Sequence, residues 1–161
     1  PDSHYRYTSP DRLGSSGLDG DAYFANHPYV AYAERRFEDA GHNLFAGRVN
    51  SDFMLDLTNP ATRSAYGVEL NRIMELKTPE NFTAYVYPNA LSQRAYADGF
   101  TGIKYPSAQY PNGGQNYMLF GGRYDAARDI QPTFNVPARP PATVPSTPKA
   151  NAPEQPSAGG Q

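Results

Sequence analysis

The stretch "DAYFANHPYVAYAE", residues 21–34, decides the fold class of this chain. Its first five residues, 21–25, have an apolar and aromatic run after Asp21, which is typical of a short β-strand. Asn26 and Pro28 form a helix-start signal, and the alanine- and aromatic-rich run after them predicts a helix that stops at Gly41. The stretch therefore predicts a strand that leads directly into a helix.

The same alternation of strand and helix signals continues along the rest of the chain. One further strand is expected before the opening stretch, five after it, and two or three helices between them. Together they predict an α+β fold, in which helices pack on a small sheet. The expected strands cover 3–9, 43–49, 52–57, 100–105, 116–121 and 132–136; the expected helices cover 58–76, as one or two helices, and 87–99.

The composition places one domain and one tail in the 161 residues. Residues 137–161 are rich in proline, alanine and serine and lack aromatic residues. Such a segment buries too little apolar surface to offset its ordering entropy, so we expect a domain over 1–136 and a disordered tail over 137–161. The chain begins with Pro1 rather than Met, which fits a processed module of a longer protein or a trimmed chain.

Charge and residue usage exclude several classes of function. The net charge is −2 and the sequence pI is about 5.9, so the chain has no global basic surface for nucleic acid. No signal peptide and no apolar run long enough to cross a membrane is present. With three histidines and no cysteine, a zinc site would need help from carboxylates, and we expect no metal. No phosphate-binding loop, dinucleotide fingerprint or hydrolase elbow is present either.

Glu34 is the first candidate for chemistry. At helical spacing it borders the apolar side formed by Val30, Ala31 and Phe37, where a carboxylate is partly desolvated and needs a partner or a function. The pattern leaves two readings open. One is a salt bridge to a neighbouring arginine or a lysine elsewhere, and the other is a functional carboxylate. His27, beside the helix start, is expected to cap or pack.

Three more residues are candidates for ligand contacts. Arg12 lies in "SPDRLGSSGLDG", a Ser-, Asp- and Gly-rich loop that lets the backbone approach a ligand, and its guanidinium could hold a phosphate. Arg6 lies between two tyrosines of the first expected strand. Ser107 follows Pro106 at a strand end and reads as an ordinary turn serine. Taken singly, each has a purely structural explanation.

Taken in order, these residues resemble a known family. Tyr23, Ala25, Ala31 and Glu34 reproduce a spacing in which a glutamate follows the tyrosine by eleven residues, with an arginine, here Arg12, eleven before it. "MLDLTNP", "LSQRAYADGFTGIKYPSA" and "QNYMLF" follow in the same order. This set, over residues 4–121, resembles the RES domain family, NAD-consuming toxins with an ADP-ribosyltransferase-like fold.

The sequence departs from that family's pattern at one point. The family's arginine is usually followed by tryptophan and asparagine, whereas Arg12 is followed by Leu13 and Gly14 and the chain has no tryptophan. This departure leaves open whether Arg12 or Arg6 fills the main arginine role. The spacing favours Arg12, with Arg6 as a second contact.

The resemblance implies a fold and a site. The fold would have a small mixed or antiparallel β core with flanking helices. NAD would be the substrate, bound in a cleft faced by Glu34, whose carboxylate would stabilise an oxocarbenium-like ribose. Arg12 would hold the pyrophosphate, Tyr23 would form an aromatic wall for nicotinamide, and Ser107 would hydrogen-bond near the nicotinamide or its ribose.

Three functions remain open at this point. The first is a toxin domain that cleaves NAD⁺ as a glycohydrolase or phosphorylase. The second transfers ADP-ribose to a protein or nucleic acid, although no E-x-E or Q-x-E pair is present to position an acceptor. The third is a tyrosine-rich binding module, to which 13 tyrosines are suited. An NAD-cleaving domain would need a neutralising immunity protein or antitoxin. We expect a secreted, antibacterial effector delivered to a target cytoplasm, with an intracellular toxin–antitoxin pair as the alternative.

Overall fold

The computed structural model describes residues 21–34, 43–76 and 78–137, and all structural statements refer to these ranges. Four strands form one mixed sheet in the order β1-β5-β4-β3. These strands are β1 (Ala22–Ala25), β3 (Met54–Asp56), β4 (Gly102–Pro106) and β5 (Gln115–Leu119). The β1–β5 and β4–β5 pairs are antiparallel, and the β3–β4 pair is parallel. The predicted α+β class is confirmed.

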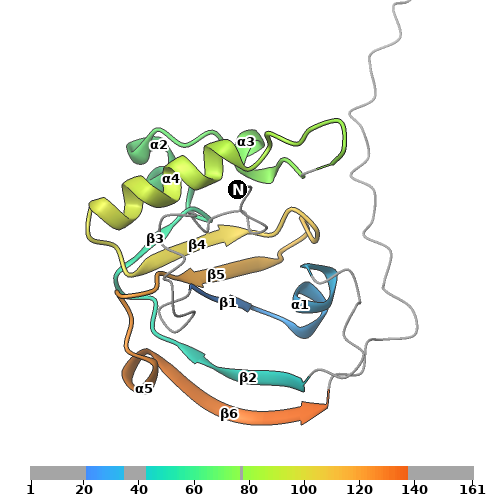
Figure 1. The fold of residues 1–161 in the computed structure, drawn as a ribbon, viewed down its shortest axis with the longest axis vertical. Helices are drawn as coiled ribbons and strands as arrows, with labels where there is room; N and C mark the ends of the chain where they lie inside the picture. Colours follow the sequence, from blue (N-terminus) through green and yellow to red (C-terminus); the bar gives the residue numbers. More distant parts are fainter. Residues whose placement is uncertain (1–20, 35–42, 77, 138–161) are drawn as a thin grey trace, which may run out of the picture.

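A second, two-stranded sheet is made by β2 (Asn43–Val49) and β6 (Ile130–Pro137), which pair antiparallel. The register shifts between Ala46 and Gly47. An alanine at position 47 would place its Cβ 2.7 Å from the carbonyl oxygen of Gln131, so the close approach of the strands at the bulge requires glycine. Figure 1 shows this pair of strands below β1, on the side away from the helices α2, α3 and α4.

Local signals account for the starts of the helices α1 and α2. The helix α1 (Pro28–Glu34) starts at the predicted proline, and residues 35–42, with the predicted stop at Gly41, lie outside the described ranges. The region 58–76 forms two helices, α2 (Pro60–Tyr66) and α3 (Leu70–Met74). Asn59 caps α2 by accepting a 2.9 Å hydrogen bond from the Ala61 amide, which confirms the Asn-Pro start signal.

Two further helices complete the described part of the chain. The helix α4 (Val86–Ala97) starts two residues before the predicted Pro88. The short helix α5 (Ala126–Asp129), just before β6, is not predicted by the sequence patterns. The expected strand over 3–9 lies outside the described residues.

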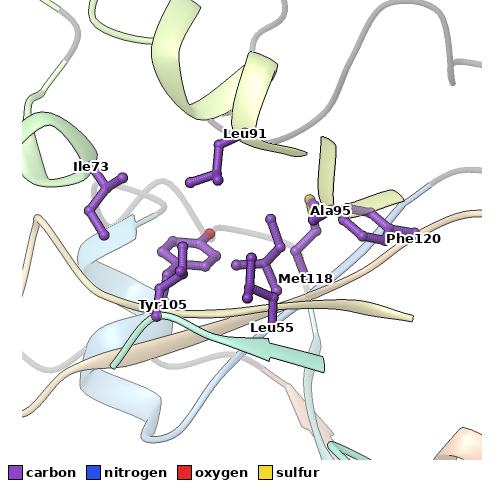
Figure 2. Packing of buried hydrophobic residues seen from close by; sticks show 9 residues of the cluster. Leu55, Ile73, Leu91, Ala95, Tyr105, Met118 and Phe120 are labelled. Carbon is purple, nitrogen blue, oxygen red and sulfur yellow. The ribbon is translucent and has the colours of Figure 1, made fainter. Parts of the chain in front are cut away.

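The core lies between the four-stranded sheet and the helices α3 and α4. Figure 2 shows Ile73 and Leu91 reaching down toward Leu55, Tyr105 and Met118. Along β4 and β5 the side chains alternate between faces, so Ile103 and Tyr105 share the core face with Asn116 and Met118. Not every apolar residue of 58–76 joins this core. Ile73 is fully buried, but Leu70 and Leu76 are exposed.

Candidate active site

The carboxylate of Glu34 meets two side chains from distant parts of the chain. Its Oε1 atom accepts a 2.6 Å hydrogen bond from Oγ of Ser107 and another of 2.6 Å from Nδ2 of Asn116. Both donors are buried, with exposed fractions of 0% and 4%, whereas Glu34 as a residue is exposed. One carboxylate oxygen is therefore fixed by buried groups at the edge of the solvent-facing surface.

Ser107 is held by its own turn. It follows β4, and its amide donates to the Gly114 carbonyl over 2.9 Å. Its Oγ also accepts a 3.0 Å hydrogen bond from the Tyr110 amide. Because that backbone donor occupies the acceptor side of the hydroxyl, the hydroxyl hydrogen points to Glu34. The serine therefore has the turn role expected from its context and, in addition, donates a hydrogen bond to the carboxylate.

Asn116 comes from the middle of the sheet. It lies on β5, opposite Ala25 of β1 on one side and Tyr105 of β4 on the other. This position buries the amide on the core face, where a polar group needs a partner. The Glu34 carboxylate supplies that partner. Asn116 belongs to the motif "QNYMLF", but the sequence alone indicates no role for its side chain. Its signal is an asparagine on the core face of a strand.

Tyr23 lies on the same face of the sheet as Asn116. The register places Tyr23 opposite Met118 and Ala25 opposite Asn116. The tyrosine is therefore two residues along the sheet from Asn116. Its ring is partly buried and packs against the core. The structure thus brings Glu34 and Ser107 into hydrogen-bond contact. Tyr23 lies at the level of Ile103 in the register, four positions before Ser107 along the sheet.

A cavity of about 480 Å³ lies between the β1–α1 segment and β2. It falls within the range of small-molecule sites, and its walls combine aromatic rings with a few polar groups. Ala31 lines it, and Glu34 lies one helical turn further along the same side of α1. Glu34 itself is not among the residues that line the cavity. The lining residues are Tyr23, Phe24, Ala25, Asn26, His27, Pro28, Ala31, Ala46, Gly47, Val49, Ser51 and Tyr117.

The capping role predicted for His27 is confirmed. Its Nδ1 accepts a 3.2 Å hydrogen bond from the Tyr29 amide, and its ring stacks on the ring of Tyr29 at 5.1 Å. Its carbonyl also accepts from the amides of Val30 and Ala31. These contacts fix the first turn of α1, and hence the direction in which the helix carries Glu34.

Lys104, the lysine nearest the site along β4, is engaged elsewhere. Its ammonium forms a 3.2 Å ion pair with Asp56 on the face of the sheet opposite Tyr105. Burial tends to raise the pKa of Asp56, but hydrogen bonds from Thr58 and the contact with Lys104 outweigh it and lower that pKa. Lys104 therefore does not form the predicted salt bridge to Glu34. Arg35 and Arg36 lie outside the described ranges, as do Arg6 and Arg12.

The described residues offer neither a cluster of metal ligands nor a membrane-spanning helix. Within the ranges that the structure describes, no group of three or more histidine and acidic side chains could hold a metal ion. Among the same residues, no helix is long and apolar enough to cross a bilayer.

Comparison with protein families places the chain. The model of the RES domain matches residues 6–141, which include every candidate residue of the site. That family is associated with NAD-related toxin–antitoxin systems, and membership indicates an NAD-related enzymatic role. No curated protein and no solved structure matches the chain.

Proposed function

The chain belongs to the RES domain family, and from that premise we propose that it is a toxin domain that cleaves NAD⁺ at the nicotinamide–ribose bond. The observation that carries the proposal is the carboxylate of Glu34, oriented by two buried neutral donors beside an aromatic cavity. Its family context and this geometry support the same chemistry, in which NAD is a substrate rather than a resident cofactor.

The chemistry requires a negative charge beside the ribose. When the bond between C1′ and the nicotinamide nitrogen breaks, the electron pair leaves with nicotinamide and positive charge develops on the ribose. Nicotinamide departs neutral, so the step needs no strong general acid. Attack on C1′ by water, with loss of a proton, gives ADP-ribose, and attack by inorganic phosphate gives the corresponding 1″-phosphate. Glu34 would stabilise the developing cation and orient the attacking group.

Neutral donors suit this task better than cationic ones. Ser107 and Asn116 fix the direction of the carboxylate while leaving its full negative charge in place, whereas an ion pair would cancel most of it. Both donors use Oε1, so Oε2 receives neither of these bonds and would face the ribose. A preorganised charge of this kind contributes most in the transition state, because the ground state carries no ribose cation.

Other residues would contact the substrate through the aromatic cavity or from the segment before β1. Tyr23 lines the cavity and would form the wall against which nicotinamide packs. Ser107 would contact substrate as well as orient the glutamate. Arg12 would hold the pyrophosphate, with Arg6 as a second contact or as its alternative. The arginine roles rest on the spacing of the sequence.

We also propose a setting for this activity. A free NAD-cleaving domain would deplete the NAD⁺ of the cell that makes it, so the producing cell needs a neutralising immunity protein or antitoxin. Delivery as a secreted effector into the cytoplasm of a target cell fits this requirement, and an intracellular toxin–antitoxin pair is the alternative. Expression of the chain alone should stop growth and lower cellular NAD⁺, while the Glu34→Gln variant should do neither. Unchanged growth and NAD⁺ with the wild-type chain would count against both settings.

The activity is tested by incubating the purified chain with NAD⁺ labelled in the adenosine moiety and following free nicotinamide. Parallel samples contain buffer alone, inorganic phosphate, or cell lysate, and Glu34→Gln is the matched control. ADP-ribose indicates hydrolysis, its 1″-phosphate indicates phosphorolysis, and label on a macromolecule indicates ADP-ribosyl transfer. Absence of nicotinamide release under all three conditions would refute the proposal and favour a non-catalytic, tyrosine-rich binding module.

A further inference from the structure

Asn26, at the corner between β1 and α1, ties this corner to the β4–β5 hairpin. Its backbone amide donates to the Gln115 carbonyl over 2.9 Å, and its Oδ1 accepts from the Gln115 amide, also over 2.9 Å. Its Nδ2 donates to the Gly113 carbonyl over 3.2 Å. The side-chain amide of Asn26 thus accepts and donates as a backbone peptide group would. It continues the hydrogen bonding between β1 and β5 beyond the end of β1.

The hairpin segment that Asn26 holds is the one that presents Ser107. Gly113 has a φ of +87°, which suits glycine, and its amide donates to the Pro111 carbonyl over 3.0 Å. The Gly114 amide then donates to Tyr110 over 3.1 Å. Because the Gly114 carbonyl receives the Ser107 amide, any movement of residues 113–114 is transmitted to the serine.

Both donors of the carboxylate depend on this attachment. Ser107 is bonded to Gly114, which follows the anchored Gly113, and Asn116 directly follows the anchored Gln115. The acceptor depends on it from the other side, since Glu34 is carried by the helix that begins two residues after Asn26. Asn26 therefore connects α1, which carries Glu34, to the hairpin that carries Ser107 and Asn116.

We propose that Asn26 is a positioning residue that sets the register between the β1–α1 corner and the β4–β5 hairpin, so that Ser107 and Asn116 meet Glu34. The inference rests on the proposed function for its kinetic consequence, but the geometry can be tested without turnover. Nothing in the spacing of the motif pointed to Asn26, which reads in sequence only as part of a helix-start signal.

The test compares Asn26→Ala and Asn26→Asp with the matched control Asn81→Ala. The amide of Asn81 donates to Glu75 over 3.3 Å in the segment before α4, so the control removes an asparagine hydrogen bond elsewhere. Asn26→Asp keeps the acceptor for the Gln115 amide and loses the donor to Gly113. Each variant is measured for kcat and KM toward NAD⁺ and for the NMR resonances of the Asn116 side-chain amide.

A positioning role predicts a split between the two constants. Asn26→Ala should lower kcat by on the order of tenfold, because misplacement acts mainly on the transition state. Asn26 also lines the cavity, so KM is expected to rise by a smaller factor than kcat falls. Asn26→Asp should fall between Asn26→Ala and the wild type. The Asn116 amide resonances should move in both variants of Asn26, whereas Asn81→Ala should leave the resonances and kcat unchanged.

The opposite results are equally specific. Normal kcat in Asn26→Ala overturns the proposal, as does an equal loss of kcat in Asn81→Ala. If Asn26→Ala does not fold, Asn26→Asp is read by the same criteria. If the wild-type chain releases no nicotinamide, the proposed function fails, and the Asn116 resonances alone decide: a shift supports the positioning role and no shift refutes it.

Discussion

Ser107 donates a 2.6 Å hydrogen bond to Glu34 across 73 positions of the chain. The bond connects the end of β4 to the last described turn of α1, and Asn116 brings a second donor to the same oxygen. Both donors are uncharged, so they orient the carboxylate without themselves forming an ion pair with it. Such an arrangement would suit the proposed role of Glu34 beside a developing ribose cation.

Replacing Glu34 by glutamine tests the charge directly. Glu34→Gln keeps the size and much of the hydrogen bonding, and it removes the negative charge. We expect kcat to fall by about 10²–10³-fold, with little change in affinity for NAD⁺, as when one preorganised stabilising group is lost. Turnover, NAD⁺ binding and the melting temperature are measured on the same preparation. A variant with a lower melting temperature and normal turnover would show that Glu34 only stabilises the fold, and it would contradict the proposed mechanism.

Asn116→Asp replaces a donor by a second carboxylate at hydrogen-bonding distance from Glu34. Two like charges this close cannot both ionise without a large cost, so the pair should share a proton at neutral pH. We expect a larger loss of kcat than in Asn116→Ala, where the donor is only removed. The pH–rate profile of Asn116→Asp should also gain a transition absent from Asn116→Ala. Identical profiles for the two variants would argue against direct contact between positions 34 and 116.

Gly114→Ala tests the turn that carries Ser107. The added Cβ would lie 2.4 Å from the Tyr110 carbonyl oxygen and 3.0 Å from Cβ of Ser107, so the turn must shift. We expect a fall in kcat of about tenfold. Gly67→Ala is the control. It strains a glycine with a φ of +68° at the end of α2, where nothing lies within 4 Å of the new Cβ. It should lower stability by about 1 kcal/mol and leave kcat unchanged; equal losses of kcat would point to general destabilisation.

The two arginine candidates predict different kinetic signatures from Glu34. Arg12→Ala should raise KM for NAD⁺ more than it lowers kcat, because a pyrophosphate contact exists in both ground and transition states. If Arg6 is the main contact instead, Arg6→Ala should show this pattern and Arg12→Ala should not. Steady-state kinetics on both variants decide between them. A normal KM in both would remove the arginines from the proposed substrate contacts.

Asp129 makes the stability of the fold sensitive to acid. Its carboxylate accepts hydrogen bonds from Arg128, from the Asp125 amide and from Asn50, and the contact with Arg128 is the largest cause that lowers its pKa to about 2. A carboxyl whose pKa is lower in the folded state stabilises the fold above its ordinary pKa of 3.8. That contribution is then lost as the pH falls toward 2.

Asp129→Asn should therefore melt about 5 °C below the wild type at pH 7. The difference between the two proteins should shrink as the pH falls from 4 to 2. Thermal melts across this range measure it, and Asp52→Asn, which changes an exposed carboxyl, serves as the control. A difference that stays constant with pH would show that Asp129 stabilises the junction between α5 and β2 by packing alone.

The local patterns predicted the elements that surround the site. The aromatic run before Asn26 and the proline after it determine where β1 ends and α1 begins, because both signals act over a few residues. The spacing from Tyr23 to Glu34 carried the resemblance to the RES domain family, to which the chain belongs. The roles of Arg6, Arg12, Tyr23, Glu34 and Ser107 in binding or cleavage stay predictions.

Pairings between distant segments were beyond the reach of the same patterns. The segments 43–49 and 52–57 look like neighbouring strands, yet β2 pairs with β6 and β3 pairs with β4. The partner of a strand is selected by packing across the whole domain, which no local window contains. The donor role of Asn116 was missed for the same reason. The helix α5 was missed because four residues are too few to show a helical period.

The sequence separation between β1 and β5 determines when the site can form during protein synthesis. Glu34 leaves the ribosome 82 positions before Asn116, an interval on the order of ten seconds at about 5–20 residues per second. During that interval the β5 partner of β1 is incomplete, and the carboxylate lacks Asn116 throughout and Ser107 for the first 73 positions. Under the proposed function, a nascent chain is therefore expected to be inactive until the β4–β5 hairpin has emerged and docked. Any truncated product that ends before β4 carries the glutamate without the groups that orient it.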